Sequence, residues 1–128
     1  MQYKREESFR YEFPKPLEAT FKLIRVETSY VESKEGKMDI LDISGGGLKM
    51  SSSLELPDPN KKEIHLEFDL QLAEHTMETQ GVIVWKKALG QSFQYGIDFT
   101  HTDKESQALI TLLKNHIKQQ SSELDGRS

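Results

Sequence analysis

The chain has no cysteine and no long apolar run, and each absence removes a class of function. Without cysteine, disulfide frameworks, cysteine-based zinc sites and thiol catalysis are excluded. No apolar stretch approaches the roughly 20 residues that span a bilayer, so membrane insertion is not expected. The first residues are charged rather than apolar, which does not fit a secretory signal. We therefore expect a cytoplasmic protein.

An excess of positive charge is also lacking. The formal net charge is -4 and the isoelectric point is near 5.6. This balance opposes sequence-independent binding to long nucleic acids, so a nucleic-acid-binding barrel would lack its basic face. A small phosphorylated ligand needs only a local basic cluster, and Lys4, Arg5 and Arg10 supply one near the amino terminus. The alternative interpretation of this segment is a solvated, charged tail.

Hydrophobic periodicity predicts six strands followed by one helix in a single domain. We expect the strands at residues 17–27, 38–44, 48–51, 64–72, 77–87 and 93–99. A phase slip at Ile24 suggests either a bulge in the first strand or a strand that is buried on both faces. Thr102 and Glu105 fit a capping box, and apolar residues recur at helical spacing after them. Many short strands and one helix predict a small closed barrel or a sandwich, with the helix covering an end or a face.

The chain then divides into three segments. Residues 1–16 form an extended amino-terminal arm, because Pro14 and Pro16 favour extended conformations in the residues before them. Residues 17–118 form the β-domain and its helix, and the polar residues 119–128 form a flexible tail.

The most informative motif is Asp42-Ile43-Ser44-Gly45-Gly46-Gly47, which follows a strand-like run. A carboxylate accepts hydrogen bonds from guanine N1–H and its amino group, and glycines allow the backbone to approach a ligand closely. Arginine forks suit phosphate oxygens and the O6/N7 edge of guanine. The alternative is a tight turn with positive φ angles, in which Asp42 and Ser44 satisfy backbone donors.

Signs of catalysis or metal binding are weak, and we expect a protein that is not an enzyme. The four histidines are scattered without metal-ligand spacing, so no metal or other cofactor is expected. Asp39 and Asp42 are expected on opposite faces of one strand, where they could not act as an acid–base pair. Trp85 could stack on a ligand, but a lone tryptophan in an apolar strand favours a place in the core.

In order and spacing, these motifs resemble the PilZ domain family. The resemblance rests on the amino-terminal arginines, on Asp42-x-Ser44-x-x-Gly47, on Gly81-x-x-x-Trp85 and on Tyr95-Gly96-Ile97-Asp98-Phe99 before the last helix. It implies a mainly β fold, a six-stranded antiparallel barrel with a carboxyl-terminal α-helix. It also implies the bacterial second messenger cyclic di-GMP as the ligand and an effector protein as the partner.

The family pattern assigns ligand contacts to Arg5, Arg10, Asp42, Ser44 and Gly47, with Lys4, Gly45 and Gly46 beside them. Arg5 and Arg10 have four residues between them, whereas the family arginines usually have three. The resemblance implies that the arm becomes ordered over the ligand and so relays binding to the partner. A PilZ-like adaptor that does not bind nucleotide and acts only through protein contacts is the alternative.

Overall fold

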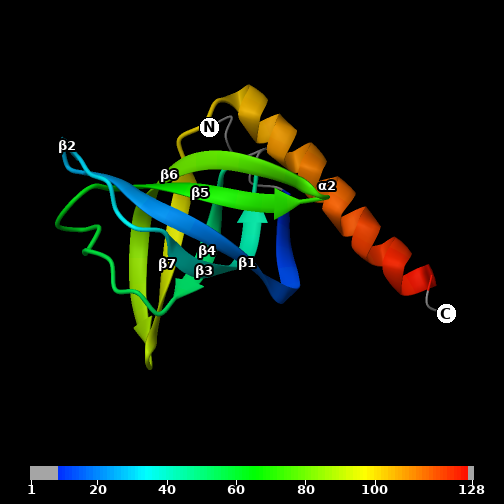
Figure 1. Cartoon of the computed structure of the whole chain (residues 1–128), viewed down its shortest axis with the longest axis horizontal. Helices are drawn as coiled ribbons and strands as arrows, with labels where there is room; N and C mark the ends of the chain where they lie inside the picture. Colours follow the sequence, from blue (N-terminus) through cyan, green and yellow to red (C-terminus); the bar gives the residue numbers. More distant parts are fainter. Residues whose placement is uncertain (1–8, 127–128) are drawn as a thin grey trace.

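The computed structural model describes the backbone of residues 9–126 and the side chains of residues 9–120. It contains seven strands followed by one helix, coloured along the chain in Figure 1. The elements are β1 (Arg10–Val26), β2 (Ser29–Tyr30), β3 (Gly36–Ser44), β4 (Gly47–Ser52), β5 (Ile64–Leu72), β6 (His75–Leu89), β7 (Ser92–Phe99) and α2 (Asp103–Gly126).

The sheet closes on itself because β1 pairs with β3 along one edge and with β5 along the other. The hydrogen-bonded order is β1, β3, β4, β7, β6 and β5, and the two-residue β2 adds to β1. All the pairings are antiparallel, including the expected hairpin of β6 and β7. This ring of six strands with a carboxyl-terminal helix confirms the predicted mainly β fold.

The first strand begins at Arg10, seven positions before the predicted start at Leu17, so the prediction of an arm through residue 16 is wrong from Arg10 onward. Pairing with β3 stops after Glu12 and resumes at Leu17, which leaves both prolines in an irregular stretch. Proline lacks the N–H that a ladder needs and is tolerated at a bulge. The prolines therefore mark an interruption within β1. The bulge expected near Ile24 is confirmed by a register shift between Leu23 and Arg25.

The interior of the ring is filled by alternate side chains of its strands. On β5 the alternation is complete, and each inward side chain has no exposed surface: Ile64, Leu66, Phe68, Leu70 and Leu72. Neighbouring strands add further buried residues, among them Phe21, Ile40, Ile43, Met50, Tyr95 and Ile97. This burial is the main source of stability, because each large apolar side chain contributes about 1.5–3 kcal/mol when it leaves water.

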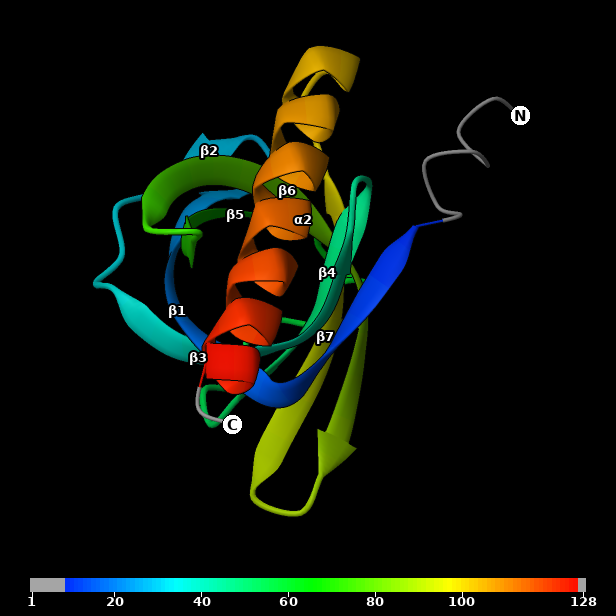
Figure 2. The same cartoon turned by 90° about the vertical axis from the view of Figure 1, so that its right-hand side faces the viewer.

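The helix α2 lies across one open end of the ring (Figure 2). Leu109 and Leu113 on its inner face are completely buried. The capping box is confirmed: Glu105 N donates to Thr102 Oγ1 at 3.2 Å, and Thr102 N donates to Glu105 Oε1 at 2.8 Å.

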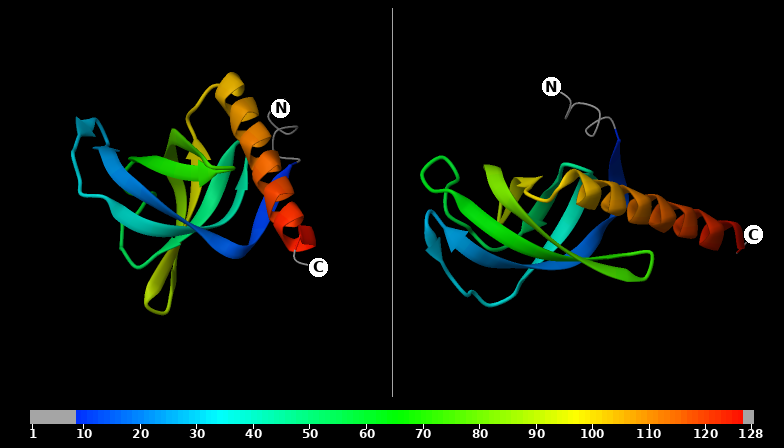
Figure 3. Two further views of the ribbon diagram at one scale, coloured as in Figure 1. Left: turned by 45° about the vertical axis from the view of Figure 1, so that its right-hand side comes forward. Right: turned by 90° about the horizontal axis from the view of Figure 1, so that it is seen from above.

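The helix runs to Gly126, so the predicted flexible tail from residue 119 is wrong for the backbone of residues 119–126. No proline or glycine interrupts this polar stretch before Gly126, and the helix continues along it beyond the strands (Figure 3).

Candidate functional site

The site is built around Arg10, which the strand pairing places directly opposite Ser44. Its guanidinium forms an ion pair with Asp42 through Nη1, and Nη2 donates to Ser44 Oγ at 3.4 Å. Arg10 and Asp42 lie 32 residues apart in the sequence. The closed ring thus brings the arginine segment and the Asp42-x-Ser44-x-x-Gly47 motif together, as adjacent antiparallel strands require for diagonal neighbours.

A second cation approaches the same carboxylate. Lys49 on β4 is the register partner of Asp42, and its Nζ lies 3.5 Å from Oδ2. The Asp42 side chain is only 11% exposed, whereas those of Arg10 and Lys49 are 47% and 37% exposed. A nearly buried carboxylate with two half-exposed cations keeps its charge compensated and leaves donors of both cations facing outward.

A bulge at Leu41 decides which way Asp42 faces. Pairing of β3 with β4 shifts register between Ile40 and Asp42, and Ile40 and Ile43 both point into the ring. Asp42 therefore lies on the outer face together with Asp39, so the expectation that these two carboxylates lie on opposite faces is wrong. An extra residue in one strand reverses the alternation that follows it.

The three glycines do not form the turn with positive φ angles that was the alternative interpretation. Among the glycines in the described residues, only Gly90 has a positive φ. The role that this interpretation gave to Ser44 is confirmed, because its Oγ accepts from the backbone N–H of Gly46 at 3.2 Å. A Cβ at Gly47 would stand 2.2 Å from the carbonyl oxygen of Ile97, whereas one at Gly46 would meet nothing within 4 Å. Gly47 is thus needed for the approach of β7, and Gly46 is the open position of the loop.

The loop is also anchored to the helix. The carbonyl oxygen of Gly45 accepts from Ser106 Oγ at 2.9 Å and from His101 Nε2 at 2.8 Å. Because a carbonyl oxygen only accepts, Nε2 carries a hydrogen, and Nδ1 on the other side of the ring forms a hydrogen bond with the Thr79 hydroxyl at 3.0 Å. The position of the glycine loop therefore depends on the first turns of α2.

These residues open onto a pocket of about 270 Å³ on the outer face of the ring. Its lining is Arg10, Asp42, Ser44, Gly46, Gly47, Leu48, Lys49, Val84, Trp85, Gly96, Ile97 and Asp98. Of the predicted site residues, Arg10, Asp42, Ser44, Gly46 and Gly47 come together here, whereas Gly45 lies in the same loop but does not line the pocket. Lys4 and Arg5 fall outside the described residues.

Trp85 belongs to this pocket, and the interpretation that it lies in the core is wrong. Its side chain is 40% exposed, and its indole rests against Gly96 on the next strand. Pairing of β6 with β7 shifts register between Ile83 and Trp85, which puts the indole on the outer face. The run Val82-Ile83-Val84-Trp85 is apolar throughout, so its pattern carried no signal of this bulge. Lys49 also lines the pocket and was not among the predicted site residues.

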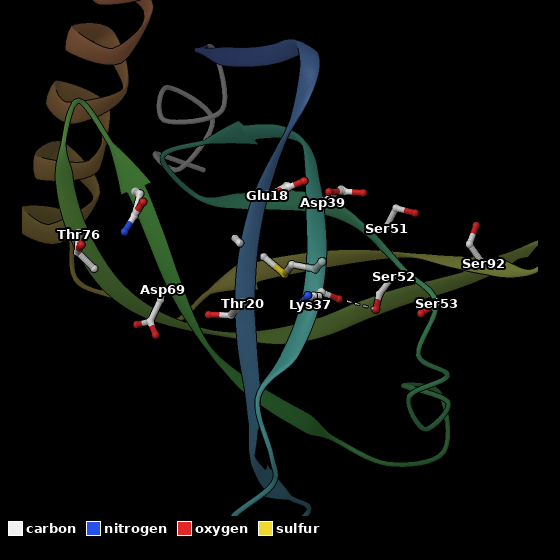
Figure 4. Close-up of a pocket in the computed structure, with 13 residues that line it drawn as sticks. Glu18, Thr20, Lys37, Asp39, Ser51, Ser52, Ser53, Asp69, Thr76 and Ser92 are labelled. Carbon is white, nitrogen blue, oxygen red and sulfur yellow. Dashed lines mark hydrogen bonds between the residues drawn. The ribbon is translucent and has the colours of Figure 1, made fainter.

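A larger hollow of about 850 Å³ lies elsewhere on the outer face of the ring and is drawn in Figure 4. Its charged side chains are Glu18, Asp39, Asp69 and Lys37, and Glu18 faces Asp39 directly across β1 and β3. Three carboxylates against one lysine repel a phosphorylated ligand. The smaller pocket is therefore the candidate site for an anion, although it is the lesser of the two hollows.

Comparison with known proteins identifies the family of the chain. The family model described as PilZ domain matches residues 4–117. The chain belongs to the PilZ domain family. The resemblance inferred from the motifs is thereby confirmed, and the family links the chain to cyclic di-GMP-related signalling. The PilZ family consists of non-enzymatic receptors and adaptors.

Among solved structures, the PilZ domain described here is similar to the Bacillus subtilis inhibitor of motility MotI/DgrA. The TM-score is 0.56 with 18% sequence identity, and the match covers 88% of this chain and 49% of that protein. The chain thus corresponds to about half the length of that protein, and the likeness supports the fold. No curated protein matches the chain in sequence.

Two further findings concern the described residues. No helix within residues 9–126 is long and apolar enough to cross a membrane. In the same part of the chain, no three histidine or acidic side chains gather closely enough to hold a metal ion.

Proposed function

We propose that this PilZ domain binds cyclic di-GMP in the pocket between Arg10 and Trp85, in the bacterial cytoplasm. The observation that carries the proposal is the contact of Arg10 with Asp42 and Ser44, which unites the two family motifs in one place. Because the ion pair orients the Arg10 guanidinium before any ligand arrives, little side-chain entropy of Arg10 itself remains to be lost on binding.

Each side chain has a chemical role in this proposal. The outward N–H groups of Arg10 donate to a phosphate or to the O6/N7 edge of guanine. Asp42 accepts from guanine N1–H and its amino group with lone pairs that Arg10 and Lys49 leave free. Ser44 holds the loop, and Gly46, which has no side chain and has open space around it, lets the ligand come close to the loop.

Trp85 adds a flat wall to the pocket. Its exposed indole stands where a purine can stack, and such a contact between a base and an aromatic ring is worth about 1–3 kcal/mol. The described pocket of about 270 Å³ is smaller than the roughly 300–1,000 Å³ of typical ligand sites. Lys4 and Arg5 are proposed to complete it from the amino-terminal side.

The relay to an effector protein is proposed to run through the start of β1 and the helix. Phe9 directly precedes Arg10, and its ring lies 5.3 Å from Lys114 Nζ on α2. Phe13 packs edge-on against His116, with ring centroids 6.1 Å apart. Since α2 also holds Gly45, ordering of the arm over a ligand would change the contacts at one face of this helix, and a partner could read that change.

Isothermal titration with cyclic di-GMP tests the binding proposal. The wild type is expected to bind, and Arg10→Ala and Asp42→Ala are each expected to weaken binding roughly ten- to a hundredfold. Arg25→Ala is the matched control, because Arg25 also pairs with a carboxylate, Glu63 at 3.2 Å, but lies outside the pocket. Equal heats for wild type, Arg10→Ala and Asp42→Ala would contradict the proposal.

The alternative is an adaptor that works without nucleotide. It is favoured by one observation: the Arg10 fork is already engaged by Asp42 and Ser44, so a ligand must share or displace these contacts. A folded wild-type protein that gives no heat with cyclic di-GMP would support this alternative.

A further inference from the structure

One row of residues crosses four adjacent strands on the outer face of the ring. Asp42 on β3 pairs in register with Lys49 on β4, Lys49 with Gly96 on β7, and Gly96 with Trp85 on β6. All four residues line the same pocket. Neighbouring strands lie about 4.8 Å apart, so the row sets a carboxylate, an ammonium group and an indole at successive steps of the pocket floor.

At Gly96, in the middle of this row, no side chain rises from the sheet. A Cβ at this position would stand 2.0 Å from Trp85 Nε1, so the indole already occupies the place of a side chain. Lys49 is therefore flanked by Asp42 on one side and by a glycine beneath a flat ring on the other. Its ammonium group is the only cation in this row.

The ion pair with Asp42 leaves Lys49 with unused hydrogen-bond donors. At 3.5 Å the contact is long, and because the lysine side chain is 37% exposed, solvent screens the pair and weakens it. An ammonium group has three donors, and Asp42 already receives a donor from Arg10 on its other oxygen. Lys49 can thus contact Asp42 and a second anion together. The other carboxylate of the pocket, Asp98, is exposed and faces Gly47, two residues along the strands from the pair of Lys49 and Gly96.

We propose that Lys49 Nζ binds a phosphoryl oxygen of the ligand, between the base held at Asp42 and the base stacked on Trp85. This inference rests on the proposed cyclic di-GMP function. A cyclic dinucleotide carries its phosphates between two bases, which matches the order of acceptor, cation and aromatic wall along the row. In this arrangement the guanidinium of Arg10 binds either the second phosphate or the O6/N7 edge of a guanine, above the row.

The test compares Lys49→Met, Lys49→Arg and the control Lys22→Met by titration with cyclic di-GMP at low and at high ionic strength. Methionine keeps the length and apolar stem of lysine without its charge, and Lys22 is exposed on β1 outside the pocket. Lys49→Met is expected to bind about tenfold more weakly and to lose part of the salt dependence of the wild type. Lys49→Arg is expected to restore most of the affinity, and Lys22→Met is expected to match the wild type.

The results distinguish a failure of the Lys49 contact from a failure of cyclic di-GMP binding itself. Wild-type binding with unchanged affinity for Lys49→Met overturns the role of Lys49 and leaves the proposed function standing. Weaker binding with an unchanged salt dependence means that Lys49 acts only by orienting Asp42, and it also overturns the phosphate contact. Absence of binding by the folded wild type overturns the proposed function together with this inference.

Discussion

The indole of Trp85 lies directly against Gly96, in the space that any side chain at position 96 would fill. Gly96→Ala is therefore expected to push the indole away from β7. Because Trp85 is the single tryptophan of the chain, its fluorescence emission should shift to longer wavelength as the ring becomes more exposed. Overpacking of this kind costs roughly 1–3 kcal/mol, which urea unfolding would measure. An emission maximum equal to that of the wild type would refute the contact.

Gly46 and Gly47 are adjacent but are expected to respond oppositely to alanine. A Cβ at Gly47 would clash with the backbone carbonyl of Ile97 at 2.2 Å, so Gly47→Ala should disturb the pairing of β4 with β7 and cost at least about 1–3 kcal/mol. Gly46 has open space and no positive φ, so Gly46→Ala should change stability by no more than about 0.5 kcal/mol. Thermal melting of the two variants side by side checks this, and equal losses would argue against it.

The two donors to the Gly45 carbonyl should behave cooperatively. Ser106→Ala alone leaves His101 as a donor at 2.8 Å and is expected to cost about 1 kcal/mol. Removing both donors leaves a buried carbonyl without a partner, so the double variant with His101→Ala should lose more than the sum of the single losses. A double-mutant cycle by urea unfolding measures this difference. The exposed Thr111→Ala on the same helix serves as the control, and strict additivity would contradict the shared anchor.

Tyr95 should make stability sensitive to alkaline pH. Its hydroxyl donates to the carbonyl oxygen of Leu54 and accepts from Leu56 N, both at 2.8 Å. Burial raises the pKa of Tyr95 above its ordinary value of 10.0, against smaller opposing effects of the Leu56 hydrogen bond and of Lys86. The phenol of the unfolded chain ionises first, so the stability that this group contributes is present below pH 10.0 and is lost as the pH rises through the raised pKa.

Tyr95→Phe tests this prediction. It is expected to cost about 1–3 kcal/mol at neutral pH, because the Leu56 amide loses its acceptor, and to flatten the loss of stability above pH 10.0. Tyr30→Phe is the matched control, since Tyr30 is 83% exposed. Equal alkaline behaviour of wild type and Tyr95→Phe would show that another group governs this range.

Much of the architecture was predictable because the buried face of a closed sheet repeats every second residue. The strict alternation of Ile64 to Leu72 predicted β5 with the bounds that the structure has. The capping box at Thr102 and Glu105 predicted the start of α2 because both partners lie within one helical turn. The motif from Asp42 to Gly47 and the distant Arg10 pointed to one site through their family pattern, and the ring brings them into contact.

The sequence by itself determined the order of the six ring strands and the helix, the apolar interior and the residue types of the candidate site, because periodicity and local capping are properties of short segments. Only the tertiary structure decided which way the side chains of the candidate site face. Bulges at Leu41 and Val84 turn Asp42 and Trp85 to the same outer face, and an irregular stretch around the prolines lets Arg10 join β1. A bulge is a mismatch in length between two paired strands, so its place depends on a partner far away in the sequence.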